Sequence, residues 1–277
     1  MESTQPIFII GTGRNGSRTM FRMLSGSKDL EIHHEFCCTH VQKLACLYSM
    51  KIVSKEYVKE KLKKIYLSAI KNSESSLWID SSNKLSWIIE PLIEVFPNAK
   101  FLLITRDGRK VTSSFYYKLR DEMYDDRSVS ILKKWLDNKK NELIPPPEKK
   151  YWWNIPQKNQ NFHEEFKDFN RLQRVAYHWY TCNKVVLDSF EKIPKSQQYI
   201  VKLEELVKEE KKLKDVIKFL EIKFDHLFVK YLQTPRNVFF PLDFQLTKKQ
   251  LKQFNEICRP LMIELGYNKD KSYVVKY

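Results

Sequence analysis

A short glycine-punctuated turn near the N-terminus holds the first residues that could do chemistry. The apolar run Ile7 to Ile10 ends at Gly11, and apolar residues return at helical spacing from Met20. A run that short and apolar predicts a buried strand, and the later spacing predicts a helix. A strand, a glycine turn and a helix form a phosphate cradle, because backbone N–H groups and the helix dipole favour an anion at the new N-terminus.

Three kinds of cradle fit this outline. In the nucleotide-hydrolase pattern G-x-x-x-x-G-K-[ST], Gly11 and Gly16 have the right spacing, but Ser17 replaces the lysine. The dinucleotide fingerprint G-x-G-x-x-G matches at Gly11, Gly13 and Gly16, although Arg14 is large for such a turn. The third kind has a basic residue two positions before the second glycine and hydroxyl groups after it.

The third pattern carries a family resemblance. Arg14-Asn15-Gly16-Ser17-Arg18-Thr19 resembles the 5′-phosphosulfate loop of the sulfotransferases, [KR]-x-G-[ST]-x-[TLA]. The resemblance implies that these six residues bind the donor 3′-phosphoadenosine 5′-phosphosulfate, and that Arg14 acts on the leaving group.

A second motif begins at Phe96 and runs through an apolar strand, 101–105, into a helix. It resembles the sulfotransferase pattern F-P-x-A-K-x-[ILV]-x-[ILV]-x-R-[DN]-P-[RK]-D-x-x-x-S-x-[YF], with Gly108 for the usual proline and Lys110 for the usual aspartate. In that family the arginine and serine hold the 3′-phosphate of the donor. They correspond to Arg106 and Ser114, and an arginine that leaves a strand end suits a phosphate as a bidentate donor.

Residues that could move a proton follow two further predicted strands. Glu35 ends a short strand that starts at Leu30, and we expect it to be the general base, with His34 as the alternative. Lys84 follows the predicted strand 77–80 and resembles the family lysine that touches the sulfuryl group. The cluster HHEFCCTH at 33–40 suggests zinc, but strand side chains alternate faces and no second cluster exists, so we expect no metal.

Composition limits the classes of protein. The chain has 277 residues, 42% hydrophobic residues and 13% aromatic residues, which predicts a globular protein with a sizeable core. No apolar run reaches the roughly 20 residues that span a bilayer, and no signal peptide is seen. Five cysteines without C-x-x-C spacing indicate free thiols in a reducing, cytoplasmic setting. The net charge of +15 favours anionic ligands, and we expect no nucleic-acid partner.

We therefore predict an α/β protein with a central parallel sheet of about five strands, helices on both faces and a helical C-terminal part, the P-loop-like sulfotransferase fold. The resemblance, closest to bacterial or tyrosylprotein-type members, implies one domain over 1–277: a cofactor-binding core at 6–119, a lid or acceptor insertion at 120–168, and a completing part with the fifth strand at 169–267. A polar loop is predicted at 234–238.

The predicted function is sulfuryl transfer from 3′-phosphoadenosine 5′-phosphosulfate to a hydroxyl or amine, leaving adenosine 3′,5′-bisphosphate. The acceptor stays open among small molecules, glycans and peptides, anionic ones included, and so does the oligomeric state. Two alternatives remain from the residues alone: an NAD- or FAD-binding oxidoreductase built on Gly11, Gly13 and Gly16, and a non-catalytic binder of polyanions.

Overall fold

The computed structural model describes residues 4–138, 144–233 and 245–267, and the loop predicted at 234–238 lies outside them. Within those residues, five strands form one parallel sheet in the order β2-β3-β1-β4-β5. The strands are β1 Gln5–Ile10, β2 Leu30–His34, β3 Leu77–Ser81, β4 Lys100–Thr105 and β5 Gln198–Lys202. The prediction of a central parallel sheet of about five strands is confirmed.

Helices connect and cover the strands. They are α1 Ser17–Leu24, α2 Cys38–Ser49, α3 Lys55–Leu62, α4 Ser68–Lys71, α5 Ile89–Val95, α6 Gly108–Lys118, α7 Asp126–Asp137, α8 Arg171–Phe190, α9 Leu203–Lys208, α10 Glu210–Phe219, α11 Leu227–Gln233 and α12 Lys248–Glu264. A π-helical segment, Lys63–Leu67, joins α3 to α4, and short 3₁₀ helices span Asn83–Trp87, Arg120–Glu122, Lys149–Tyr151, Glu165–Lys167 and Lys195–Gln197. None of the helices in the described ranges is long and apolar enough to cross a membrane.

The two faces of the sheet pack into separate cores because neighbouring strand residues point to opposite sides. Phe8 and Ile10 of β1 pack with residues of α2, α3, α5 and α8, whereas Ile7 and Ile9 pack with residues of α1, α10 and α11. Every β1 residue after Gln5 is buried, as a strand covered on both faces requires. Helices on both faces are thus confirmed.

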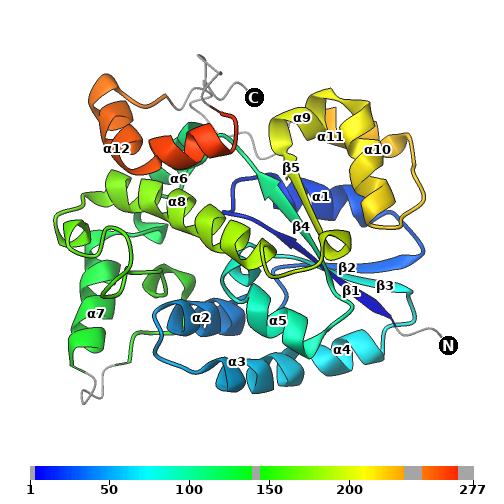
Figure 1. Ribbon diagram of the computed structural model, residues 1–277, viewed down its shortest axis with the longest axis horizontal. Coiled ribbons are helices and arrows are strands. Elements are labelled where there is room, and N and C mark those ends of the chain that lie inside the picture. Colours follow the sequence, from blue (N-terminus) through cyan, green and yellow to red (C-terminus); the bar gives the residue numbers. More distant parts are fainter. Residues whose placement is uncertain (1–3, 139–143, 234–244, 268–277) are drawn as a thin grey trace.

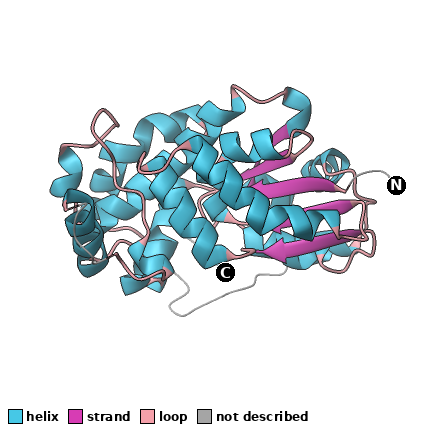
Figure 2. Cartoon of the chain, turned by 90° about the horizontal axis from the view of Figure 1, so that it is seen from below, coloured by secondary structure: helices cyan, strands magenta, loops and turns pink. Residues whose placement is uncertain are grey.

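A third core holds the helical part of the molecule, where α6, α7, α8 and α12 pack together with the 151–169 segment. In Figure 1, α8 crosses the molecule beside α6 and α12, and Figure 2 shows the sheet at one end and this helical part at the other. The region 120–168, which sequence patterns did not resolve, contains α7 and three 3₁₀ turns, and Tyr151, Trp152 and Phe166 from it are buried.

Strand order decides where a ligand can bind. The chain runs outward from β1 to β2 and returns to β3, and then crosses β1 to form β4. In an open parallel sheet, such a reversal leaves a crevice outside the carboxyl ends of the strands. The glycine turn follows β1 and Arg106 follows the adjacent β4, so both motifs meet at this crevice.

Candidate active site

The turn after β1 requires glycine for steric reasons. Gly16, the residue before α1, has φ 94°, and a Cβ there would lie 2.6 Å from Leu203. A Cβ on Gly11 would lie 1.9 Å from the Asn15 amide. No side chain caps α1, and its first turn has no acidic residue. The helix N-terminus therefore remains available to an anion, as the cradle prediction requires.

The side chain of Asn15 fixes the turn to the sheet. It is fully buried, and its Nδ2 donates to the Ile104 carbonyl of β4 at 2.7 Å. Ser17 is buried as well, and its carbonyl accepts from Ser81 Oγ of β3 at 2.9 Å. The turn is thus held by both neighbouring strands. The Nδ2 group of Asn15 is committed to β4, and its Oδ1 has no partner among the described residues, so an anion would contact the backbone N–H of Asn15.

The two sequence motifs come together around Arg14. Its backbone has φ 56°, and its Nε donates to Ser114 Oγ of α6 at 3.0 Å. Arg106 NH1 donates to the Arg14 carbonyl at 2.7 Å. Two guanidinium groups and a hydroxyl, separated by about a hundred residues in sequence, therefore converge at the edge of β1 and β4. Such a group suits a phosphate or sulfate ester.

Gly108, where the family pattern has proline, is explained by packing. A Cβ on this residue would lie 2.7 Å from the Trp179 ring and 2.8 Å from Phe254. Trp179 Nε1 also donates to the Arg106 carbonyl at 3.0 Å. The contact between α8 and the start of α6 thus positions Arg106, and it leaves no room for a side chain at 108.

A second charged cluster forms around Glu35. The strand β2 ends at His34, so Glu35 lies just beyond it, with φ 58° and its N–H donated to the Ser81 carbonyl at 3.2 Å. The prediction that Glu35 is the last strand residue is therefore wrong by one position. Because the backbone turns there, the Glu35 carboxylate contacts Lys84 after β3 and Lys149 from the 120–168 region.

The charges in this cluster shift one another's pKa values. Burial alone would raise the pKa of Glu35, but the hydrogen bonds and charges of Lys84 and Lys149 outweigh it and lower that pKa to about 2. Burial lowers the pKa of Lys84 to about 8, with Lys149 acting in the same direction and Glu35 against it. At neutral pH both Glu35 and Lys84 therefore carry their charges.

His34, the alternative base, lies next to this cluster. Its Nδ1 is 2.8 Å from the Ser81 carbonyl, which can only accept, so the proton is on Nδ1 and Nε2 carries the lone pair. The ring stacks on Phe21, and burial lowers its pKa below the ordinary value. His34 is a neutral imidazole at pH 7.

The first residues of the cradle connect the two clusters. The Thr12 carbonyl accepts from Asn83 Nδ2 at 3.5 Å and from His178 Nε2 at 3.0 Å. Asn83 Oδ1 in turn accepts from Lys84 Nζ at 2.9 Å. Asn83 therefore links the glycine turn to Lys84, because its side chain bonds to both. Of the donor-loop residues, Arg18 is exposed and Thr19 is partly buried on α1.

Two residues of this arrangement were not predicted. Lys149 lies in a lysine pair of the 120–168 region, and no local motif distinguishes it. His178 is an isolated histidine in a long helix, the usual sign of a core residue. Only folding brings either one to the site. In the residues that the structure describes, no group of three His, Cys, Asp or Glu side chains could hold a metal ion.

Comparisons with known proteins find similarity to sulfotransferases. The model of the sulfotransferase family matches residues 6–141. A sulfotransferase from Mycobacterium avium has the same fold, with a TM-score of 0.52 at 12% identity over 100% of this chain and 79% of that one. A sulfotransferase from Alicyclobacillus acidocaldarius gives a TM-score of 0.49 at 14% identity over 96% and 95%. A search of curated protein sequences gives no match.

Proposed function

We propose that this chain, whose residues 6–141 match the model of the sulfotransferase family, transfers a sulfuryl group from 3′-phosphoadenosine 5′-phosphosulfate to an acceptor. The observation that carries the choice of donor is the convergence of Arg14, Arg106 and Ser114 beside the glycine turn. A donor with phosphate groups at both its 5′ and 3′ positions needs two anion sites close together, and this convergence supports the proposal that both lie at this edge of the sheet.

Each part of the donor has matching residues. The backbone N–H groups of 14–19 at the start of α1 would hold the 5′-phosphosulfate, since no side chain caps that helix. Arg106 and Ser114 would hold the 3′-phosphate, and Arg14 lies between the two sites through its contact with Ser114. An oxidoreductase built on the three glycines would give Arg106 and Ser114 no role, and no contact within residues 4–138, 144–233 and 245–267 favours that alternative or a polyanion binder.

The proposed chemistry is an in-line displacement at sulfur. The bond between sulfur and the acceptor oxygen forms while the bond between sulfur and the bridging phosphate oxygen breaks, and that oxygen leaves with the electron pair on adenosine 3′,5′-bisphosphate. Lys84 and Arg14 stabilise the negative charge that develops there, as fixed cations do in a site with little water. Glu35 takes the proton of the acceptor.

Glu35 is a poor general base while its carboxylate is paired with both Lys84 and Lys149. A carboxylate with a pKa of about 2 is a weak base, whereas the pKa rises when a neutral hydroxyl replaces Lys149. We therefore expect the acceptor to displace the Lys149 ammonium from Glu35. Glu35→Gln should reduce the rate by roughly 10²–10⁴-fold with donor affinity kept, and His34→Ala should keep most of the rate. The opposite pattern would make His34 the base.

Binding of the donor product is the direct test. The chain should be stabilised against heat by adenosine 3′,5′-bisphosphate and much less by adenosine 5′-monophosphate, NAD or ATP, because a ligand stabilises only the state that binds it. Equal stabilisation by adenosine 5′-monophosphate would show that no 3′-phosphate site exists. We also propose a reducing, cytoplasmic setting, supported by five free cysteines.

A further inference from the structure

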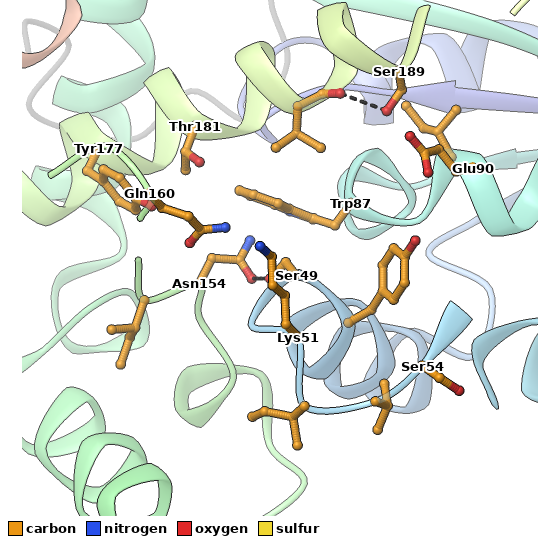
Figure 3. A pocket seen from close by; sticks show the side chains of 16 residues that line it. Ser49, Lys51, Ser54, Trp87, Glu90, Asn154, Gln160, Tyr177, Thr181 and Ser189 are labelled. Atoms are coloured by element: carbon orange, nitrogen blue, oxygen red, sulfur yellow. Dashed lines mark hydrogen bonds between the residues drawn. The ribbon is translucent and has the colours of Figure 1, made fainter. Parts of the chain in front are cut away.

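A cavity of about 530 Å³ lies beside the proposed active site, between α2, the start of α5 and α8. We call it the α2–α8 cavity. Figure 3 shows Trp87 across its centre, with Ser49 and Asn154 on one side and Thr181 on the other. Its volume falls within the range of small-molecule sites, and neither sequence motif includes it.

Most residues that line the α2–α8 cavity are apolar or uncharged. Apolar side chains come from Trp87 and from five aliphatic residues, which are Ile52, Val53, Ile89, Ile155 and Val185. Hydroxyl and amide groups make up most of the remainder. The charged residues that line it are Lys51, which is exposed, and Glu90, which pairs with Lys192. The cavity therefore suits an uncharged molecule, although the whole chain is strongly positive.

A second, small space lies next to this cavity. We call it the gorge: it shares the lining residues Trp87 and Asn154 with the α2–α8 cavity, and Lys84 also lines it. Its volume is about 10 Å³, which is close to the room that one water molecule needs. One small polar group on a larger ligand could therefore extend from the cavity toward Lys84.

Two residues that line the gorge carry buried polar atoms without partners among the described residues. They are Trp153 Nε1, a donor, and His178 Nδ1. His178 Nε2 donates to the Thr12 carbonyl, so Nδ1 has the lone pair, and burial lowers the pKa of His178 to about 4, which keeps the ring neutral. A buried donor left unpaired is costly, and a ligand oxygen that accepts from Trp153 Nε1 would remove that cost.

A hydroxyl group matches Trp153 because its oxygen accepts a hydrogen bond from Nε1, while its one proton stays available to Glu35. An ammonium group does not match, since it cannot accept from Trp153 and would lie near the charged Lys84. We propose that the α2–α8 cavity and the gorge form the acceptor site, and that its substrate is an uncharged small molecule with an apolar body and a hydroxyl group. This inference rests on the proposed function and narrows its acceptor from hydroxyl or amine to hydroxyl.

Binding of three matched probes tests the hydroxyl. Phenylbutanol, butylbenzene and phenylbutylamine share a body and differ in the end group. By calorimetry with adenosine 3′,5′-bisphosphate present, phenylbutanol should bind about 10-fold more tightly than the other two, because a site built for a hydroxyl rejects analogues without it. Trp153→Phe, which keeps the ring that stacks on Tyr124, should abolish that preference and leave butylbenzene unchanged. Equal affinities in the parent protein would refute the hydroxyl assignment.

Filling the cavity tests its location. Val185→Phe should weaken the binding of phenylbutanol and of butylbenzene by at least about 10-fold, because the new ring fills part of the cavity. Asp188→Phe adds the same ring to the same helix at a half-exposed position outside the lining, and it should change neither affinity. Thr181→Phe replaces the first variant if that one does not fold. Unchanged binding in a folded cavity variant would place the acceptor elsewhere.

The two proposals can fail separately. Stabilisation by adenosine 3′,5′-bisphosphate is measured for every variant, and phenylbutanol binding is also measured without nucleotide. If the bisphosphate binds and phenylbutanol does not, or if an acidic tyrosine peptide is sulfated in place of phenylbutanol, the acceptor inference is wrong and the donor assignment stands. If the bisphosphate does not bind, the proposed function fails, whatever the cavity binds.

Discussion

Replacing Lys149 by methionine should release the Glu35 carboxylate from one of its two cations. The pKa of Glu35 is lowered from its ordinary value of 4.5 to about 2, which corresponds to roughly 3 kcal/mol. Lys84 and Lys149 share this effect, and the Lys149 side chain is 44% exposed, so solvent screens its part. We assign about 1 kcal/mol of this effect to Lys149. Its replacement by methionine should therefore raise the pKa of Glu35 by somewhat less than one unit.

The sign of the pH dependence follows from the direction of the shift. A carboxyl whose pKa is lower in the folded state stabilises the fold above its ordinary pKa, and this stabilisation is lost as the pH falls from about 4.5 to about 2. Lys149→Met should therefore lower the free energy of unfolding by about 1 kcal/mol at pH 7, and the difference should vanish only as the pH approaches 2.

Carboxyl ¹³C NMR titration measures the pKa directly, with Glu35→Gln to assign the signal. Lys150→Met is the matched control, because Lys150 is the adjacent lysine, is similarly exposed and pairs with Glu148. It should leave the pKa of Glu35 unchanged. If the pKa of Glu35 is the same in the parent, in Lys149→Met and in Lys150→Met, Lys149 does not hold this carboxylate in solution and the argument for its displacement by the acceptor fails.

Three further outcomes are expected. In calorimetry, Arg106→Ala should weaken adenosine 3′,5′-bisphosphate binding by about 2–4 kcal/mol, and Ser114→Ala should weaken it by about 1 kcal/mol. If both variants bind the bisphosphate as tightly as the parent protein, these residues do not form a 3′-phosphate site. Turnover should fall as the pH rises through about 8, because Lys84 loses its charge there. Lys84→Arg should shift this fall in turnover to higher pH. If the fall stays at the same pH in Lys84→Arg, another group causes it. Gly108→Ala should cost about 1–3 kcal/mol in urea unfolding. The control Gly26→Ala, where a Cβ meets no atom within 4 Å, should change stability by less than about 0.5 kcal/mol, and equal effects of the two would contradict the packing argument.

The sequence by itself determined the sheet and the first approach to the site. The strands β1, β3 and β4 contain short apolar runs, and each is followed by polar residues at the carboxyl edge of the parallel sheet, so strand prediction also placed Arg14, Lys84 and Arg106 at that edge. The glycine spacing around Arg14 could also be recognised in the sequence. Positive φ angles and close backbone approach leave few residue types other than glycine at these positions.

Tertiary structure decided which groups touch. A base was expected at Glu35 from its place in a strand, yet the chain turns out of β2 one residue earlier, and this turn sets its contact with Lys84. Lys149 and His178 reach the site from the 120–168 region and from α8, over more than ninety residues in each case. Such contacts depend on how distant segments pack across the sheet. Local sequence periodicity predicts helices and strands but does not predict that packing. The cavity beside Trp87 likewise exists only because α2, α5 and α8 meet around it.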